Sequence, residues 1–120
     1  METILIVEDE QNLLKLLELT FKSHGYKVIK AINGAEAYST AVKESPNLIL
    51  LDILLPGESG LEVLKKLKEE EKTKDIPVVM LTNFSEPDMM GQAKRLGAKD
   101  YLIKSDNDPS TVLEKIQKYL

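Results

Sequence analysis

The chain has 120 residues, the length of one compact domain, and we expect a single domain over residues 1–120. Apolar residues make up 42% and charged residues 30%, a globular balance that excludes a disordered or fibrous chain. The absence of cysteine excludes a disulfide framework and a thiolate metal site, and the formal net charge of −4 disfavours direct binding to nucleic acid. Protein partners are therefore expected.

The amino terminus and the hydropathy of the chain bear on its location. Met1 to Thr3 and the short apolar run after them lack the basic region and long apolar core of a signal peptide. No apolar run approaches the roughly 20 residues that cross a bilayer. We expect a cytoplasmic protein without a membrane segment.

Five short apolar runs predict five β-strands. In chain order they are Thr3 to Val7, Lys27 to Ile32, Leu48 to Leu51, Val78 to Leu81 and Tyr101 to Ile103. The third and fourth runs are continuously apolar, as in strands that helices cover on both faces of a parallel sheet. These two are predicted to be central strands.

The segments after the strands carry apolar residues at helical spacing. The first four helices are predicted to bury, in chain order, Leu13, Leu14, Leu17 and Phe21; Ala37 and Ala41; Leu61, Leu64 and Leu67; and Met89, Ala93 and Leu96. Stop signals are Gly25 after the first helix, Pro46 after the second and Gly97 after the fourth. In the fifth, Asp108 can cap a helix that has Pro109 in its first position and Val112 and Ile116 toward the sheet.

Strands that alternate with helices predict an α/β fold of the (βα)5 type. Right-handed crossovers place helices on both faces and make a doubly wound, five-stranded parallel sheet. In such sheets, functional groups gather beyond the carboxyl ends of the strands. Those ends are where chemistry is expected.

Charged and polar residues follow four of the predicted strands: Glu8 and Asp9, Asp52, Thr82 and Lys104. Carboxylates this close repel by roughly 4 kcal/mol per pair at 4 Å and an effective dielectric of about 20. Mg²⁺ relieves the repulsion, because it prefers oxygen ligands and binds carboxylates together with phosphate oxygens. We expect Asp9 and Asp52 as direct ligands, and Asp52 as a nucleophile toward phosphorus, with Lys104 and Thr82 engaging the phosphoryl oxygens.

Each of these residues also has an ordinary structural interpretation. Asp9 can cap the first helix, and Asp52 can be a solvated loop acid. Thr82 can be a β-branched strand residue and Lys104 a charge at a sheet edge. Their joint position at one edge of the sheet favours the functional interpretation over four separate coincidences.

Several blocks of sequence resemble the receiver domains of two-component response regulators over essentially the whole chain. They are Ile4 to Glu10, Asn33-Gly34, Pro46 to Ile53, Pro56 with Gly60, and Gly97 to Lys104. The resemblance implies a flavodoxin-like sandwich with strand order 2-1-3-4-5. It also implies that the protein is a signalling switch and not an enzyme. Such a switch catalyses only its own phosphorylation and its slow autodephosphorylation.

The resemblance assigns roles by position. It implies that Asp52 is the phosphoacceptor, that Glu8 and Asp9 are the acidic pair that assembles Mg²⁺, and that the backbone carbonyl of Leu54 completes the metal site. Thr82 and Lys104 match the switch pair that engages the phosphoryl group. Tyr101 matches an aromatic residue that swings inward on activation, and an ordinary core tyrosine is an equally open interpretation.

The resemblance also implies partners. The phosphoryl donor is a sensor histidine kinase or a histidine phosphotransfer protein. A downstream protein target reads the surface of the fourth helix, fifth strand and fifth helix, and the domain is a monomer or a weak phosphorylation-dependent dimer. Gly91 inside the fourth helix favours a shift of that helix on phosphorylation.

The chain departs from the family pattern at several positions. Ser105 follows Lys104 where proline with a cis peptide is usual, so a trans bond is expected. Asn83 stands where a small residue is usual, and Glu8 where aspartate is commoner. Leu54 and Phe84 are apolar at positions that tune dephosphorylation, and we hypothesise that they lengthen the phosphorylated state.

Three other protein classes compete with this interpretation. A haloacid dehalogenase-type hydrolase also uses an aspartate nucleophile and Mg²⁺, but needs a second acid where Leu54 stands. A flavin-binding module would place phosphate beside Glu8 and Asp9, which repel it. A degenerate receiver that serves only as an interaction module is disfavoured by the intact set of acids, Thr82 and Lys104.

Overall fold

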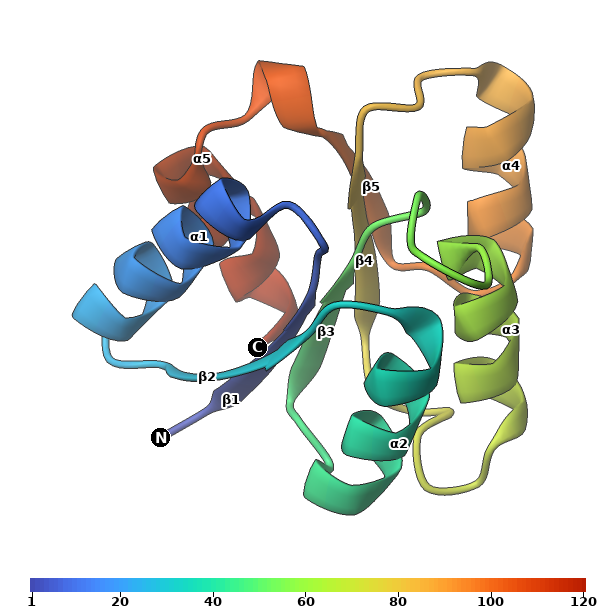
Figure 1. The fold of residues 1–120 in the computed structure, drawn as a ribbon, viewed down its shortest axis with the longest axis horizontal. Helices are drawn as coiled ribbons and strands as arrows, with labels where there is room; N and C mark the ends of the chain where they lie inside the picture. The colour runs from blue at the N-terminus through green and yellow to red at the C-terminus, as the bar shows by residue number, and fades with distance from the viewer.

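The fold is a parallel sheet with helices on both faces. The structure is a computed structural model that describes all residues, 1–120. The five strands lie in the order β2-β1-β3-β4-β5, as expected (Figure 1). Helices α1 and α5 cover one face, and α2, α3 and α4 cover the other. The elements are β1 Thr3–Val7, α1 Gln11–Ser23, β2 Lys27–Ala31, α2 Gly34–Glu44, β3 Leu48–Leu51, α3 Gly60–Glu69, β4 Val78–Thr82, α4 Pro87–Arg95, β5 Asp100–Ile103 and α5 Pro109–Ile116, with short 3-10 turns at Lys104–Asp106 and Gln117–Tyr119.

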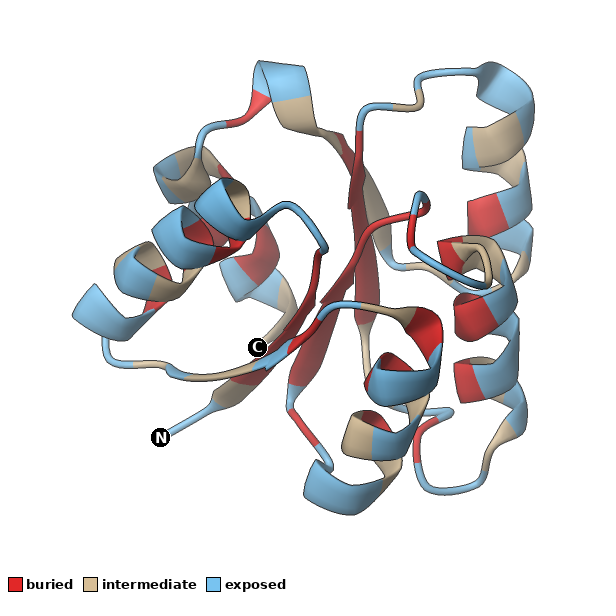
Figure 2. Ribbon diagram, in the orientation of Figure 1, coloured by how far each residue is buried: buried red, intermediate tan, exposed pale blue.

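The central strands supply both layers of the hydrophobic core. Successive side chains of a strand point to opposite faces, so Leu5 and Val7 of β1 enter the core under α2 and α3, while Ile4 and Ile6 enter the core under α1 and α5. All residues of β3 and β4 are buried (Figure 2). The continuous apolar runs were therefore correctly predicted as central strands.

Local signals set most of the helix ends where they were predicted. The Asn33 side chain accepts a hydrogen bond from the Glu36 N–H at 2.8 Å, and Asp108 caps α5 by accepting from the Thr111 N–H at 2.8 Å. Gly25 and Gly97 follow α1 and α4 with positive φ, which confirms them as stop signals. No helix is long and apolar enough to cross a bilayer.

Some predicted details are wrong. The second strand ends at Ala31, and Ile32 is exposed beyond it. On α3, Val63 is buried although it was not predicted to be, and Leu61 packs on the core but is only half-buried. The predicted end of the second helix is confirmed: α2 ends before the buried Pro46, and Ser45, left-handed with a φ of 46°, closes it by donating its N–H to the Ala41 carbonyl.

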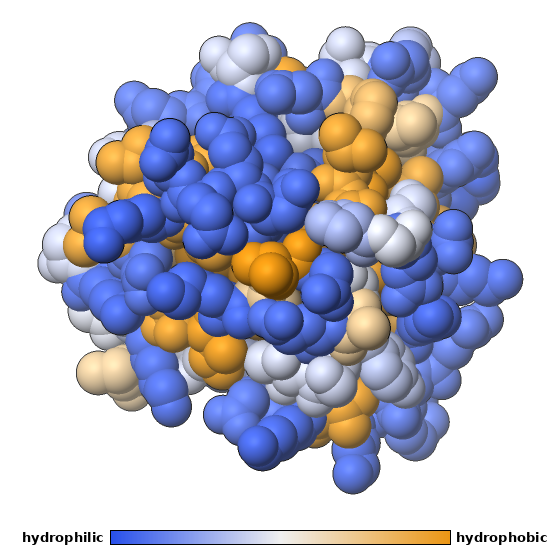
Figure 3. Space-filling model, viewed as in Figure 1, coloured by the Kyte–Doolittle hydropathy of each residue, from blue (hydrophilic) through white to orange (hydrophobic).

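One face of the molecule is mostly hydrophilic. On the face in Figure 3, separate apolar patches lie between hydrophilic residues. Apart from Met1, the exposed large apolar side chains are scattered over α1, α4 and the loops after β2 and β3. They are Leu16, Leu19, Ile32, Leu54 and Met90.

Candidate functional site

The carboxyl ends of β1, β3, β4 and β5 meet at one edge of the sheet, at the top of Figure 1. Main-chain bonds carry the strand register into the first residues beyond the strands. The Glu8 N–H donates to the Ala31 carbonyl at 3.0 Å, and the Asp52 N–H donates to the Val7 carbonyl at 3.1 Å. The sheet itself therefore fixes the backbone positions of Glu8 and Asp52.

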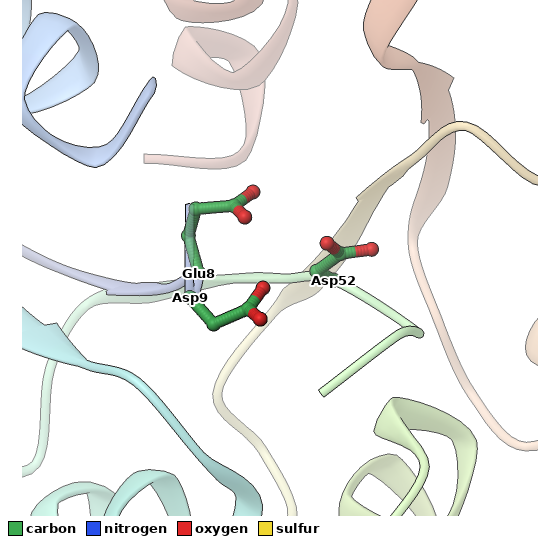
Figure 4. A group of neighbouring side chains, drawn as sticks. All are labelled: Glu8, Asp9 and Asp52. Atoms are coloured by element: carbon green, nitrogen blue, oxygen red, sulfur yellow. The ribbon is translucent and has the colours of Figure 1, made fainter. Parts of the chain in front are cut away.

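The three predicted acids converge. Carboxylate oxygens of Glu8, Asp9 and Asp52 lie within 4.8 Å of one another, and the side chains of Glu8 and Asp9 extend toward Asp52 (Figure 4). Glu8 is 2% exposed and Asp52 is 4% exposed, whereas Asp9 is open to solvent. Two buried carboxylates and an accessible one therefore share a small volume.

Lys104 neutralises part of this charge. Its Nζ lies 2.7 Å from Glu8 Oε1 and 2.6 Å from Asp52 Oδ2, and its side chain is 13% exposed. Burial alone would lower the pKa of Lys104, but its hydrogen bonds and ion pairs with Asp52 and Glu8 outweigh burial and raise the pKa above its ordinary value. Burial raises the pKa of Glu8 despite its contact with Lys104. The lysine is thus a charged partner of both buried acids.

The loop after β3 fixes the second oxygen of Asp52. Asp52 Oδ1 accepts from the Ile53 N–H at 2.7 Å and from the Leu54 N–H at 3.3 Å. Gly60 packs on this loop: its N–H donates to the Ile53 carbonyl at 2.7 Å, and a Cβ at Gly60 would lie only 1.9 Å from the Asp52 carbonyl oxygen. Only glycine permits this close approach of α3 to the Asp52 backbone.

Thr82 and Tyr101 lie on the two strands beyond β3. Thr82 is the buried last residue of β4, one residue further into the strand than predicted, and its Oγ1 accepts from the Phe84 N–H at 3.4 Å. The half-buried Tyr101 donates its hydroxyl to the Phe84 carbonyl at 2.6 Å. Burial, with the charges of Glu86 and Asp52, raises the pKa of Tyr101. Phe84 therefore connects the two residues through its backbone.

The loop after β5 begins at Lys104 and carries this residue away from the sheet. The chain has no cis peptide bond, so the bond between Lys104 and Ser105 is trans, as expected. A single 3-10 turn over Lys104–Asp106 carries the chain away from the sheet. Asn107, which the sequence interpretation overlooked, ends this turn with only 9% of its surface exposed. An asparagine before Asp-Pro signals a turn, but not a buried amide.

The donor set fits a hard divalent cation. All the ligand atoms offered are carboxylate oxygens, which Mg²⁺ prefers, and one ammonium stands against three carboxylates, so negative charge remains. Leu54 leaves its side chain 67% exposed, and its N–H is the group turned toward Asp52. The site therefore combines a fixed carboxylate, excess negative charge, a lysine and a nearby hydroxyl.

Comparison with known proteins agrees with this geometry. Residues 4–117 match the family model described as the response regulator receiver domain. The chain is 37% identical over 119 residues to sporulation initiation phosphotransferase F of Bacillus subtilis, with 99% of this chain and 94% of that protein covered. It is 42% identical over 103 residues to the phosphate regulon transcriptional regulatory protein PhoB of Pseudomonas aeruginosa, covering 86% of this chain but only 45% of that protein. The crystal structure of chemotaxis protein CheY4 of Vibrio cholerae superimposes with a TM-score of 0.92 at 31% identity, covering 100% of this chain and 99% of that one.

Proposed function

The chain belongs to the response regulator receiver family, and we propose that it accepts a phosphoryl group on Asp52 from the phosphohistidine of a sensor histidine kinase or a histidine phosphotransfer protein. The observation that carries the proposal is the environment of Asp52. This buried carboxylate has Lys104 Nζ at 2.6 Å and two further acids within 4.8 Å. Burying a carboxylate beside other carboxylates is costly unless positive charge compensates it, and one lysine against three acids leaves room for a cation.

Four groups would hold the metal: the carboxylates of Glu8, Asp9 and Asp52 and the backbone carbonyl of Leu54. Mg²⁺ bound there supplies positive charge that reduces the repulsion between the Asp52 carboxylate and the phosphoryl oxygens. Asp9 is the exposed acid of the set, whereas Glu8 and Asp52 are buried. Glu8 is engaged with Lys104 until that lysine turns to another partner.

The transfer itself uses the side chains of this chain for positioning and charge. An oxygen of the Asp52 carboxylate attacks phosphorus and forms the new O–P bond. The P–N bond to the donor imidazole breaks, and the ring nitrogen keeps the bonding pair and takes up a proton. Lys104 leaves its place between Glu8 and Asp52 to pair with a phosphoryl oxygen, and the Thr82 hydroxyl donates to another.

The switch follows from the contacts around Phe84. A phosphoryl group brings about −1.5 to −2 charges, enough to draw the Thr82 hydroxyl toward it. That movement releases the Phe84 N–H from Thr82, and the same residue's carbonyl holds the Tyr101 hydroxyl. Tyr101 then moves inward, and the surface of α4, β5 and α5 changes for a downstream protein. The exposed Lys94 and Arg95 of α4 are part of that surface.

The proposal is tested by intact mass measurement after incubation with phosphoramidate, with and without Mg²⁺. The native protein is expected to gain one phosphoryl group only with Mg²⁺, and Asp52→Asn is expected to gain none. Asp88→Asn, which removes an exposed acid of α4, is the matched control and should behave as the native protein does. A native protein that gains no phosphate under these conditions would contradict the proposal and favour the degenerate receiver that serves as an interaction module.

A further inference from the structure

The loop that follows Lys104 is held by one buried side chain. The Asn107 Nδ2 group donates to the carbonyl of Ile103 at 2.8 Å, and the Asn107 backbone N–H donates to the carbonyl of Lys104 at 3.3 Å. Ile103 ends β5, and Lys104 is the next residue. Asn107 therefore binds the carbonyl groups of the two residues that determine how Lys104 leaves the sheet.

The orientation of the Asn107 amide is set from α5. Its Oδ1 atom accepts from Lys115 Nζ at 2.6 Å. An ammonium group only donates hydrogen bonds, so it must face the amide oxygen, and the amide nitrogen is then turned toward Ile103. Lys115 is otherwise exposed on α5. The exposed side of this helix is thus connected to the loop of the site by one contact.

Lys104 needs such support because of the distance its side chain spans. It starts at the end of β5, an edge strand, and reaches Glu8 after β1 and Asp52 after β3. A flexible four-carbon side chain delivers its ammonium to a fixed point only if its backbone is fixed. Ser105 places no restriction on the backbone comparable to that of proline. The restraint in this chain comes from Asn107.

We propose that Asn107 is the positioning residue for Lys104, and that Lys115 holds Asn107 in its working orientation. The inference rests on the proposed role of Lys104 in phosphorylation. It adds a path of contacts from the surface of α5 through Lys115 and Asn107 to the backbone at Ile103 and Lys104, and from the Lys104 side chain to Asp52. A protein that binds Lys115 from solvent would release the Asn107 amide and thereby alter the site, and phosphorylation would alter the surface around Lys115 in return.

A double-mutant cycle tests the proposal. The rate of phosphorylation by phosphoramidate with saturating Mg²⁺ is measured for the native protein, Asn107→Ala, Lys104→Met and the double variant. Asn107→Ala removes the side-chain hydrogen bonds and is expected to slow phosphorylation of the otherwise native protein roughly 2- to 10-fold. No further slowing is expected in the Lys104→Met background, because Asn107 acts through Lys104. Equal slowing in both backgrounds would mean that Asn107 serves only the fold, and would overturn the proposal.

The unfolding free energies of the same four proteins provide an answer that does not depend on phosphorylation. Asn107→Ala is expected to destabilise the native background more than the Lys104→Met background, since only the former contains the ion pairs that Asn107 positions. Additive losses contradict the proposal. A native protein that takes up no phosphate, but shows this coupling in stability, would refute the proposed function and leave the positioning role standing.

Variants of Lys115 keep the test decisive if Asn107→Ala folds poorly. Lys115→Met removes the donor from an exposed position and is expected to slow phosphorylation about 2-fold, again only when Lys104 is present. Lys115→Arg retains a cationic donor and should restore most of the rate. Lys65→Met, at an exposed position of α3, is the matched control and should change nothing. Equal rates for Lys115→Met and the native protein would remove Lys115 from the path.

Discussion

Replacing Lys104 by methionine tests the electrostatic balance on which the site depends. The substitution removes the ammonium from between Glu8 and Asp52 and leaves an apolar side chain of similar length. Glu8 and Asp52 are 2% and 4% exposed, so neither carboxylate can recover its hydration without a change in structure. We expect a marked loss of stability at neutral pH.

The expected magnitude follows from the two ion pairs. At 2.7 Å and an effective dielectric of about 20, the attraction between Lys104 and Glu8 is about 6 kcal/mol, and the contact with Asp52 at 2.6 Å is comparable. The cost of burying the charges offsets much of this attraction. Removal of one partner from a buried pair costs about 3–5 kcal/mol, because the remaining charge is uncompensated. Lys104→Met is expected to lose that amount at about pH 7.

The dependence on pH provides the specific signature. Burial raises the folded-state pKa of Glu8 above its ordinary value of 4.5, so the folded protein binds a proton that the unfolded chain releases. Stability associated with Glu8 is therefore present below about pH 4.5 and is lost as pH rises through the raised pKa. Lys104→Met makes Glu8 still harder to ionise. The loss in free energy of unfolding that Lys104→Met shows relative to the native protein should therefore shrink as the pH falls from about 7 to about 5.

Urea unfolding of the native protein and Lys104→Met at these two pH values measures the deficit. Added Mg²⁺ at neutral pH should stabilise the variant more than the native protein, because the cation replaces the missing positive charge. Lys65→Met controls for loss of a lysine as such. A variant as stable as the native protein at neutral pH, or a deficit independent of pH, would refute the electrostatic reasoning.

Three further predictions concern the surroundings of the site. Tyr101→Phe removes the hydrogen bond to the Phe84 carbonyl and should lower the free energy of unfolding by about 1 kcal/mol in urea titrations, whereas an unchanged value would show that the bond contributes nothing. Asp108→Ala removes the cap of α5 and should lower the melting temperature at neutral pH without slowing phosphorylation. The hydrogen bond with Thr111 lowers the pKa of Asp108, so the stabilisation from this cap is present above pH 3.8 and is lost as the pH falls through the lowered pKa. Melting curves of the native protein and the variant at acid pH will check this loss. Leu54→Asn replaces an exposed apolar side chain beside Asp52 by one that can orient water, and should shorten the lifetime of the phosphorylated protein, measured by phosphate release; an equal or longer lifetime would contradict the hypothesis.

Much of the fold was predictable because it depends on local signals. The continuous run at Leu48–Leu51 has the predicted bounds, and such a short apolar run is typical of a strand buried on both faces. The ends of β2 and β4 and the start of β5 were misplaced because hydrophobicity does not report register: Thr82 belongs to β4 through its pairing with Ile103, and Asp100 belongs to β5 through its pairing with Val79. The deeper burial of Val63 than of Leu61 on α3 also depends on packing against the sheet.

The sequence predicted which residues gather at the candidate site, but not the contacts that they make there. Parallel strands bring their carboxyl ends to one edge, and this rule alone placed Glu8, Asp9, Asp52 and Lys104 together. The sequence carries no sign that Lys104 lies between Glu8 and Asp52 in the free protein, because this depends on side-chain reach across the sheet. The same holds for Asn107, whose partners are set by the path of a short turn.

The site of phosphorylation can be read directly by borohydride reduction of the phosphorylated protein followed by peptide mass spectrometry. Reduction converts an aspartyl phosphate to homoserine and so marks the acid that carried the phosphoryl group. The structure predicts homoserine at position 52 alone, formed only when Mg²⁺ was present during phosphorylation. A mark at Asp9, or a reduced Glu8, or the absence of any mark from a protein that has gained phosphate, would contradict the assignment of Asp52 as the phosphoacceptor.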